Sequence, residues 1–171
     1  GNPRPRLFRL TGAQALINRM GFNNVGVEEF LRNLGRSSWR GILGINIGKN
    51  FDTPLARAGE DYALCLERVY AHASYVAINV SSPNTAGLRD LQSAEALSVL
   101  LSRIKTLRTK LQQQFGRNVA IALKIAPDLD DAQIRDIAAI ARREGIDGIV
   151  ATNTTVSRAG VESYANGMQA G

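Results

Sequence analysis

Residues 79–89 have the sequence NVSSPNTAGLR, and they follow a short apolar run, residues 75–78, that predicts a buried strand. A long amphipathic pattern typical of a helix begins shortly after them. The strand is therefore followed by amides, adjacent serines and a proline turn, which packing alone does not explain. In α/β proteins the carboxyl ends of parallel strands carry the chemistry. We expect this segment to belong to a functional site.

The same alternation of strand and helix extends outward on both sides of the segment. Apolar runs predict further strands over residues 42–47, 119–125 and 148–155. Helical spacing predicts four helices. The first covers residues 27–34, the second follows the Thr53-Pro54 turn and ends at about residue 73, the third begins at about residue 93, and the fourth runs from 130 to 144. An extended piece is expected at 7–10, a polar loop at 18–24 and irregular chain over 156–171.

Local signals predict how two of these helices are bounded and packed. Asp130 followed by Gln133 is a variant of the capping box, and glycines at 116 and 145 mark helix ends. The helix from residue 93 is expected to bury Leu97, Leu100, Leu101, Ile104 and Leu111. The helix from residue 130 is expected to bury Ile134, Ile137, Ala138 and Ala141.

Apolar strands that alternate with helices indicate a parallel sheet. Neither a GxGxxG nor a GxxxxGK[ST] pattern occurs, which disfavours the doubly wound nucleotide-binding folds. We therefore predict a TIM (β/α)8 barrel, of which this chain supplies the middle part, about four of the eight βα units.

Composition excludes several classes of protein. The 171 residues, with 44% hydrophobic and 21% charged, suit one globular domain or part of one. The single cysteine, Cys65, excludes an internal disulfide, and one His with one Cys leaves no zinc cluster, so no metal site is expected. The net charge of +6 comes from scattered arginines without interleaved aromatics, so we expect no nucleic-acid binding.

Every predicted strand of the sheet carries a polar group at or near its carboxyl end. These groups are Asn46, Asn79, Lys124 and the pair Thr152 and Asn153. Lys124 interrupts an apolar run, and a buried lysine needs an anionic partner or loses its charge. Neutral amides suit a planar heterocycle with donors and acceptors, and a lysine suits a group that becomes negative during a reaction.

Other side chains have simpler interpretations. His72 lies at a helix end and is expected to be solvated, and Asp128 is expected to serve as a cap. Ser82 has no basic side chain beside it in sequence, so a role in proton transfer would depend on its surroundings.

The motifs together resemble class 2 dihydroorotate dehydrogenase over essentially the whole chain. They are NRMGFN at 18–23, GINIGKN at 44–50, NVSSPNTAGLR at 79–89, KIAPDL at 124–129 and ATNTT at 151–155. The resemblance implies an FMN-containing barrel that oxidises (S)-dihydroorotate to orotate in de novo pyrimidine synthesis.

The resemblance also implies a role for each motif residue. Ser82 would be the catalytic base that takes the C5 proton while hydride leaves C6 for the flavin. FMN would be contacted by Asn46, Asn79, Lys124 and Thr152. The substrate would be held by Asn18, Arg19, Met20, Gly21, Phe22, Asn79, Asn84, Asn153 and Thr154.

The residue at position 82 separates the classes of this family. Class 1 relatives carry Cys at the position of Ser82 and pass electrons to fumarate or NAD, whereas serine points to class 2 and a membrane quinone. A serine hydroxyl is a poor base when free, so we suggest a relay through Thr85 and an ordered water.

Family members extend beyond this sequence, so residues 1–171 are expected to be the central part of a single FMN-binding barrel domain. The quinone-binding and membrane-binding helices would precede them, and the FMN phosphate site would follow. The complete enzyme would lie peripherally on the inner face of the bacterial membrane, or on the mitochondrial inner membrane in a eukaryote. A half barrel with two open sheet edges is expected to be unstable and inactive alone.

Alternatives remain open at this point. A class 1 dihydroorotate dehydrogenase or a dihydropyrimidine-type dehydrogenase shares the chemistry, although Ser82 argues against both. A barrel lyase could use Lys124 as a Schiff base, and the isolated chain could be a non-catalytic binding fragment. Flavin absorbance separates the oxidoreductases from the rest.

Overall fold

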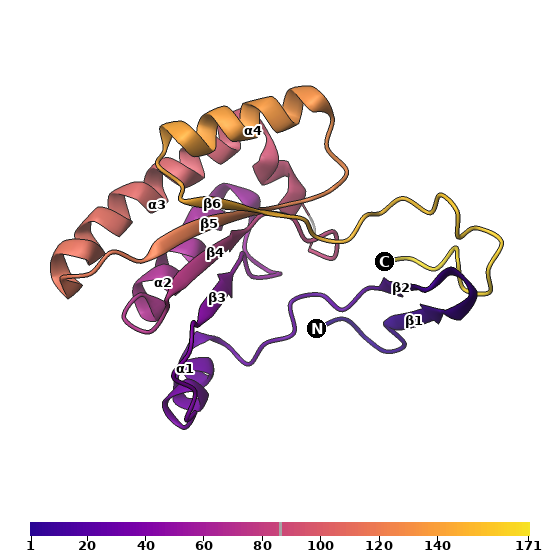
Figure 1. Ribbon diagram of the computed structural model, residues 1–171, viewed down its shortest axis with the longest axis horizontal. Helices are drawn as coiled ribbons and strands as arrows, with labels where there is room; N and C mark the ends of the chain where they lie inside the picture. Colours follow the sequence, from indigo (N-terminus) through magenta and orange to yellow (C-terminus); the bar gives the residue numbers. More distant parts are fainter. Residues whose placement is uncertain (86) are drawn as a thin grey trace.

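A computed structural model describes residues 1–85 and 87–171, so Ala86, in the segment 79–89, lies outside the described residues. Its centre is a parallel sheet whose strand order follows the chain, as Figure 1 shows. The strands are β3 (Gly44–Ile47), β4 (Tyr75–Asn79), β5 (Ala120–Ile125) and β6 (Gly148–Ala151). All neighbouring pairs are parallel, as the alternation of strands and helices predicts.

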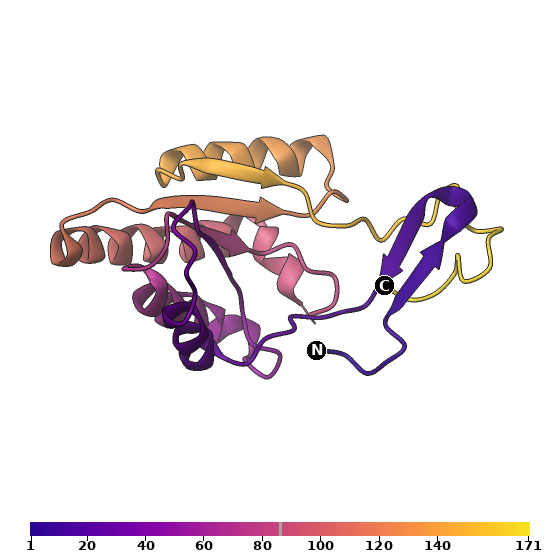
Figure 2. The ribbon, with the colours of Figure 1, turned by 60° about the horizontal axis from the view of Figure 1, so that its bottom comes forward.

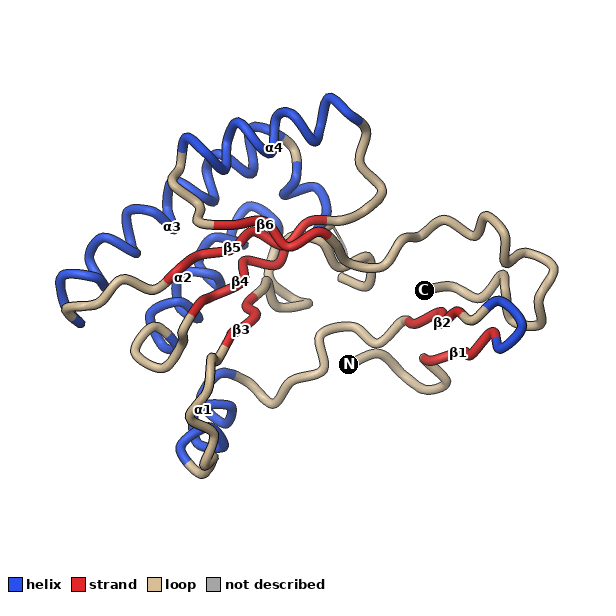
Figure 3. The backbone as a smooth tube through the Cα atoms, in the orientation of Figure 1, coloured by secondary structure: helices blue, strands red, loops and turns tan. Residues whose placement is uncertain are grey.

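The connections between the strands are helical. The helices are α1 (Val27–Gly35), α2 (Ala58–Val69), α3 (Ala94–Phe115) and α4 (Asp131–Arg143). Short 3-10 turns are η1 (Thr11–Ala13), η2 (Leu55–Arg57) and η3 (Leu88–Gln92). Helix α3 lies between α2 and α4 and contacts both, and Figure 3 shows these helices gathered beside the strands. In the part of the chain described, no helix is both long and apolar enough to span a membrane.

The hydrophobic core lies between these helices and one face of the sheet. Alternate strand residues point into it, among them Ile45, Val76 and Ile121, which pair across the sheet. From α3 the core receives Leu97, Leu100, Leu101, Ile104 and Leu111, which confirms the prediction for this helix. Burial of this apolar surface is the main stabilising contribution to the fold.

The opposite face of the sheet is lined by small and polar residues. One row across the four strands consists of Asn46, Ala77, Ala122 and Gly148. The next row toward the carboxyl ends pairs Asn79 with Lys124 and Lys124 with Val150. Because side chains alternate along a strand, apolar packing on one face leaves these positions free for a site.

An antiparallel hairpin precedes the sheet and is formed by β1 (Leu7–Leu10) and β2 (Ala15–Asn18). The extended piece at 7–10 is confirmed, but the sequence analysis missed β2 and placed Asn18 in a loop. The register of the hairpin is set by the tight turn between its strands, in which Gln14 has a φ of 49°. Figures 1 and 2 show the hairpin beyond the carboxyl ends of the strands, beside the last residues of the chain.

The boundaries of several elements differ from those expected. Strand β3 begins at Gly44, with Ile42 79% exposed, and β6 ends at Ala151 rather than at 155. Helix α4 buries Ile137, Ile140 and Ala141, so the expected burial of Ile134 and Ala138 is wrong. Ile134 lies on the same stripe as Ile137 and Ala141, but it is in the first turn of α4, where 46% of its surface is exposed.

Predicted helix ends are confirmed in detail. The Asp130 carboxylate accepts a hydrogen bond from the Gln133 N–H, and the Gln133 side chain accepts one from the Asp130 N–H. Gly116 and Gly145 have φ values of 63° and 70°, the left-handed conformation that glycine adopts without strain.

Candidate functional site

The carboxyl ends of β4, β5 and β6 meet around the hydroxyl of Ser81, which is fully buried. Its Oγ donates a hydrogen bond to Asn79 Oδ1 over 2.7 Å. It accepts hydrogen bonds from Asn153 Nδ2 at 3.0 Å and from Lys124 Nζ at 3.4 Å. The structure thus brings together three of the predicted strand-end residues through a serine that the sequence analysis did not single out.

This arrangement fixes which atoms remain available to a ligand. The Asn79 Oδ1 accepts both the Ser81 hydroxyl and the Ser81 N–H, the latter at 3.0 Å. The Asn153 Oδ1 accepts the N–H of Thr154 at 2.7 Å. Within the described chain, the Asn79 Nδ2 has no acceptor and Lys124 Nζ has no partner other than Ser81. The cluster therefore offers donors, which suit carbonyl oxygens or an anionic group.

Lys124 is partly rather than fully buried. Desolvation lowers the pKa of its ammonium group, because burial disfavours the charged form. None of the ion pairs formed by the described residues involves Lys124. An anion placed beside it would favour the charged form and reverse the effect of desolvation.

Two further buried polar side chains support the ends of β3 and β4. The Tyr62 hydroxyl of α2 donates to the carbonyl of Asn79 at 2.7 Å, and burial raises the pKa of this phenol. Lys49, 5% exposed, donates to the carbonyls of Asn50 and Thr53, each at 2.7 Å. The sequence analysis assigned no separate role to Tyr62 or Lys49, because their hydrogen-bond partners are set by the fold.

Ser82 is 8% exposed, and its Oγ accepts the N–H of Asn84 at 3.3 Å. That bond leaves the Ser82 hydroxyl proton without an assigned acceptor among the described residues. Thr85, the suggested relay residue, is also buried. No acidic or basic side chain bonds to the Ser82 oxygen in the part of the chain that the structure describes.

Arg89 connects the chain segments that follow β4, β5 and β6. Its Nε donates to the carbonyl of Ser81 at 3.1 Å, and its Nη2 donates to the carbonyl of Thr154 at 3.1 Å. Its Nη1 forms an ion pair with Asp128 Oδ2 at 2.8 Å. Asp128 also accepts from the Thr155 hydroxyl and from the N–H of Val156. The cap expected at Asp128 is wrong, because Asp130 caps α4 instead.

The remaining predicted residues lie around this cluster. The ring of Phe22 lies beside Gly48, so loop 18–22 reaches the segment after β3. The Arg19 side chain bonds the carbonyl of Pro5 at 3.0 Å and stacks over Phe8, and is thus engaged within the hairpin region. The other predicted residues have no direct bond to the cluster in the described structure: Asn18, Met20, Gly21, Asn46, Asn84 and Thr152.

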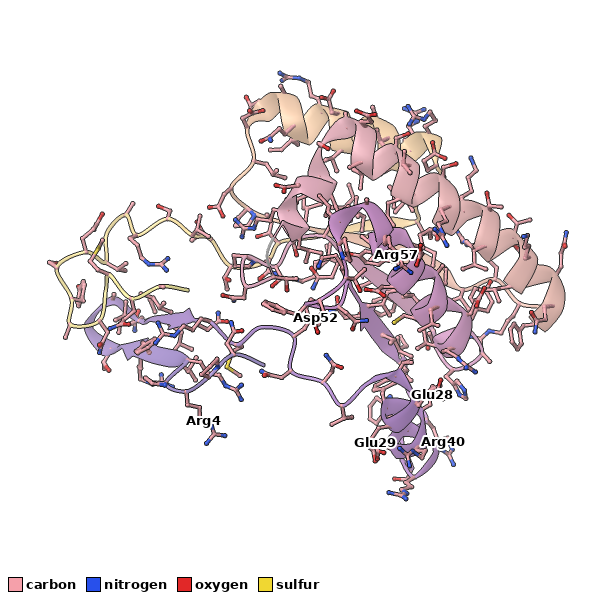
Figure 4. The ribbon with its side chains drawn as sticks, turned by 180° about the vertical axis from the view of Figure 1, so that it is seen from behind. Arg4, Glu28, Glu29, Arg40, Asp52 and Arg57 are labelled. Carbon is pink, nitrogen blue, oxygen red and sulfur yellow. The ribbon has the colours of Figure 1, made fainter. Side chains whose placement is uncertain are left out.

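Charged groups elsewhere are dispersed. Figure 4 shows Arg4 in the segment that precedes the hairpin, Arg40 beside α1 and Arg57 at the start of α2, on separate parts of the molecule. Among the described residues, no three His, Cys, Asp or Glu side chains gather in the way a metal ion needs. A groove between α2 and α3 lies on the helical side of the sheet and contains none of the predicted site residues.

A parallel sheet with its strands in chain order, helices on one face and polar groups at the carboxyl ends is the arrangement found in part of a (β/α) barrel. A model of the dihydroorotate dehydrogenase family matches residues 1–170. The chain belongs to the dihydroorotate dehydrogenase family, as its motifs predict.

Relatives and solved structures agree with this assignment. The chain is 59% identical over its whole length to dihydroorotate dehydrogenase (quinone) of Thiobacillus denitrificans, covering 51% of that protein. It is 53% identical to the protein of the same name from Pseudomonas fluorescens, covering 50% of it. A ligand-free dihydroorotate dehydrogenase structure from Eimeria tenella matches the whole chain with a TM-score of 0.88 at 38% identity, over 52% of its own chain. The predicted barrel fold is confirmed, and the chain spans about half the length of its curated relatives.

The network around Asp128 predicts how stability depends on pH. Partial burial alone would raise the pKa of this carboxyl, but hydrogen bonds from Thr155, Val156 and Arg89 outweigh it and hold the pKa below its ordinary value. The resulting stabilisation is present above the unfolded pKa, about 3.9, and is lost as pH falls through the lower folded value. In urea unfolding, Asp128→Asn should be less stable than the parent at pH 6, with the gap closing toward pH 3.

The exposed Asp136 of α4 supplies the matched control, since no described residue bonds to its carboxylate. Asp136→Asn should show a small difference from the parent that does not grow with pH. A gap for Asp128→Asn that stays constant from pH 6 to pH 3 would contradict the role assigned to this carboxylate.

Proposed function

We propose that residues 1–171 are the central part of a single FMN-binding barrel domain, in a protein that oxidises (S)-dihydroorotate to orotate. Quinone is the proposed final electron acceptor. The proposal rests on membership of the family, on relatives named dihydroorotate dehydrogenase (quinone), and on the donor cluster around Ser81. The cluster carries most weight, because a heterocycle with carbonyl and carboxylate oxygens needs the donors that Asn79 and Lys124 present.

The small residues on the face of the sheet opposite the core support binding of a flat cofactor there. The row formed by Asn46, Ala77, Ala122 and Gly148 is small, and a Cβ added at Gly148 would meet nothing within 4 Å. We infer that FMN is held by Asn46, Asn79, Lys124 and Thr152. When bound, FMN supplies the acceptor for the hydride that leaves the substrate. Lys124 supplies positive charge where negative charge accumulates.

Substrate recognition is assigned to the amides and to the loop beside the hairpin. Asn79, Asn84, Asn153 and Thr154 would bond the ring and its carboxylate, together with residues 18–22. The position of Phe22 beside Gly48 supports this, because it brings the loop toward the carboxyl ends of the strands. Since the Arg19 side chain bonds Pro5, we infer that its backbone rather than its guanidinium faces the substrate.

Ser82 is the proposed catalytic base. Forming the C5–C6 double bond of orotate removes a proton from C5 and a hydride from C6, and the Ser82 Oγ accepts that proton. Its own hydroxyl proton must leave at the same time, which is why a relay through Thr85 is part of the proposal. The burial of Ser82 and Thr85 supports a path shielded from bulk water.

The residue at position 82 and the names of the relatives support a proposal for the electron acceptor and the location. We propose that the complete protein passes the electron pair to a membrane quinone, giving quinol. It would contact the inner face of the cell membrane peripherally, through parts of the protein that the 171 residues do not include.

Substitution of Ser82 is the direct test of the proposed chemistry. In the complete protein, Ser82→Ala should slow dihydroorotate-driven flavin bleaching by about 100-fold or more, the usual contribution of a general base. Stopped-flow absorbance under anaerobic conditions measures this step before any acceptor is added. Ser82→Cys should retain part of the rate, and Ser102→Ala, at an exposed serine of α3, should match the parent. A normal rate for Ser82→Ala contradicts the proposed role.

Lys124 offers a second test through cofactor binding. Lys124→Met keeps a side chain of similar length but removes the charge, so the purified protein should hold less flavin and be reduced more slowly by dihydroorotate. Lys110→Met, at an exposed position of α3, is the matched control and should leave both quantities unchanged. Equal flavin content and reduction rates in the two variants would remove Lys124 from the proposed cofactor site.

The final electron acceptor can be identified with the same flavin-loaded parent protein. After reduction by dihydroorotate, reoxidation should be fast with a soluble quinone analogue and slow with fumarate or NAD. Preferential use of fumarate or NAD would assign the protein to the other class of the family despite Ser82.

A further inference from the structure

We propose that Arg89 is a positioning residue. Its guanidinium holds the segments that directly follow β4 and β6 (called here the exits of these strands) at the separation that the substrate-binding amides require. This inference rests on the proposed function and adds a residue that neither touches substrate nor belongs to the predicted site. Its basis is the set of contacts that one side chain makes to segments far apart in sequence.

Arg89 bonds acceptors on different chain segments with different nitrogens. The Ser81 carbonyl follows β4, the Asp128 carboxylate follows β5, and the Thr154 carbonyl follows β6. Strands β4 and β6 are not neighbours in the sheet, because β5 lies between them. Each of them is joined to β5 by backbone hydrogen bonds, and among the described residues the direct links between the segments after β4 and β6 are made by side chains.

The same exits carry the candidate substrate contacts. Asn153, directly before Thr154, donates its amide hydrogen to the Ser81 Oγ at 3.0 Å. Arg89 thus bonds the backbone carbonyls of Ser81 and Thr154. The hydrogen bond between the side chains of Asn153 and Ser81 links the same two segments. A shift of Thr154 would move Asn153 relative to Ser81 and, through Ser81, relative to Asn79.

The side chain must be arginine for geometric reasons. A planar guanidinium presents several N–H donors in fixed directions, whereas a lysine ammonium is a compact charge on a flexible stem. The Arg89 and Asp128 side chains are 22% and 24% exposed, so their pairing is partly shielded from solvent. Asp128 in turn accepts hydrogen bonds from the Thr155 hydroxyl and the N–H of Val156. The network of Arg89 therefore includes more of the segment after β6.

The turn that carries Arg89 is itself anchored. Gln92, 5% exposed, accepts the N–H of Ala126 at 2.9 Å and donates to the Arg89 carbonyl at 3.4 Å. Turn η3 is therefore attached to the exit of β5 as well. This attachment holds the backbone of Arg89 in place, so that its side chain can bond the segments after β4 and β6.

The chain contains a matched control at the other end of the sheet. Arg108 pairs with Asp147 at 2.8 Å, bonds the Gly145 carbonyl at 3.1 Å, and Asp147 accepts the N–H of Ile121 at 2.7 Å. This pair has the same chemistry and the same length as the pair of Arg89 with Asp128, but it lies where β5 and β6 begin. Loss of either pair costs stability, whereas only Arg89 lies beside the amides.

The experiment compares Arg89→Ala, Arg89→Lys and Arg108→Ala in the complete flavin-loaded protein. Both Arg89 variants should raise the orotate Kd and the KM for dihydroorotate by about tenfold, because small misplacements of binding groups are costly. The Kd comes from the change in flavin absorbance on titration with orotate. The Arg108→Ala values should stay within about twofold of the parent, as expected for a change remote from the site. Amide hydrogen exchange over residues 152–156 should become faster in the Arg89 variants only.

The outcomes are distinct. Parent-like orotate binding in Arg89→Ala, or an equal loss in Arg108→Ala, overturns the positioning role. If the parent itself fails to oxidise dihydroorotate, the proposed function fails. Hydrogen exchange alone then tests whether Arg89 holds the segments after β4 and β6 in place. Faster exchange over 152–156 in the Arg89 variants supports it, and exchange equal to that of Arg108→Ala overturns it.

Discussion

The hydroxyl of Ser81 determines the arrangement of the candidate site. A serine hydroxyl has one proton, and here it goes to the Asn79 side-chain oxygen, so Asn153 and Lys124 act as donors to the same serine oxygen. Within the described chain this leaves the amide nitrogen of Asn79 without an acceptor and Lys124 with Ser81 as its hydrogen-bond partner. A donor-rich surface at the carboxyl ends of three strands therefore follows from the direction of one hydrogen bond.

The fold separates the groups that stabilise it from the groups that form the site. Apolar side chains fill the face of the sheet against α2, α3 and α4, and the opposite face keeps the small row that includes Ala77 and Ala122. Buried polar groups at the strand exits would be destabilising if left unpaired, because desolvation costs about 1–3 kcal/mol per group. Ser81 and Gln92 instead find partners on neighbouring segments, so the polar exits are compatible with a stable core.

Sequence patterns predicted much of this architecture. The four parallel strands, the buried residues of α3 and the capping box at Asp130 follow from local spacing, and all are observed. The grouping of Asn79, Lys124 and Asn153 followed from the rule that parallel strands end on the same side. Strand β2 was missed, because its pairing with β1 is set by the turn between them and not by its own pattern. The burial of Ile134 was wrongly predicted, because helical spacing identifies a stripe but not how far along the helix the neighbouring elements cover it.

By itself, the sequence determined the order of strands and helices, the polar groups at the strand ends and the family to which the chain belongs. The tertiary structure alone decided that Ser81 joins those groups and that Arg89 bridges the exits of β4 and β6. The physical reason is distance along the chain. Asn153 and Ser81 are separated by 72 positions, and Arg89 and Asp128 by 39, so no local pattern encodes either contact. They form only because parallel pairing through β5 brings the strand ends together.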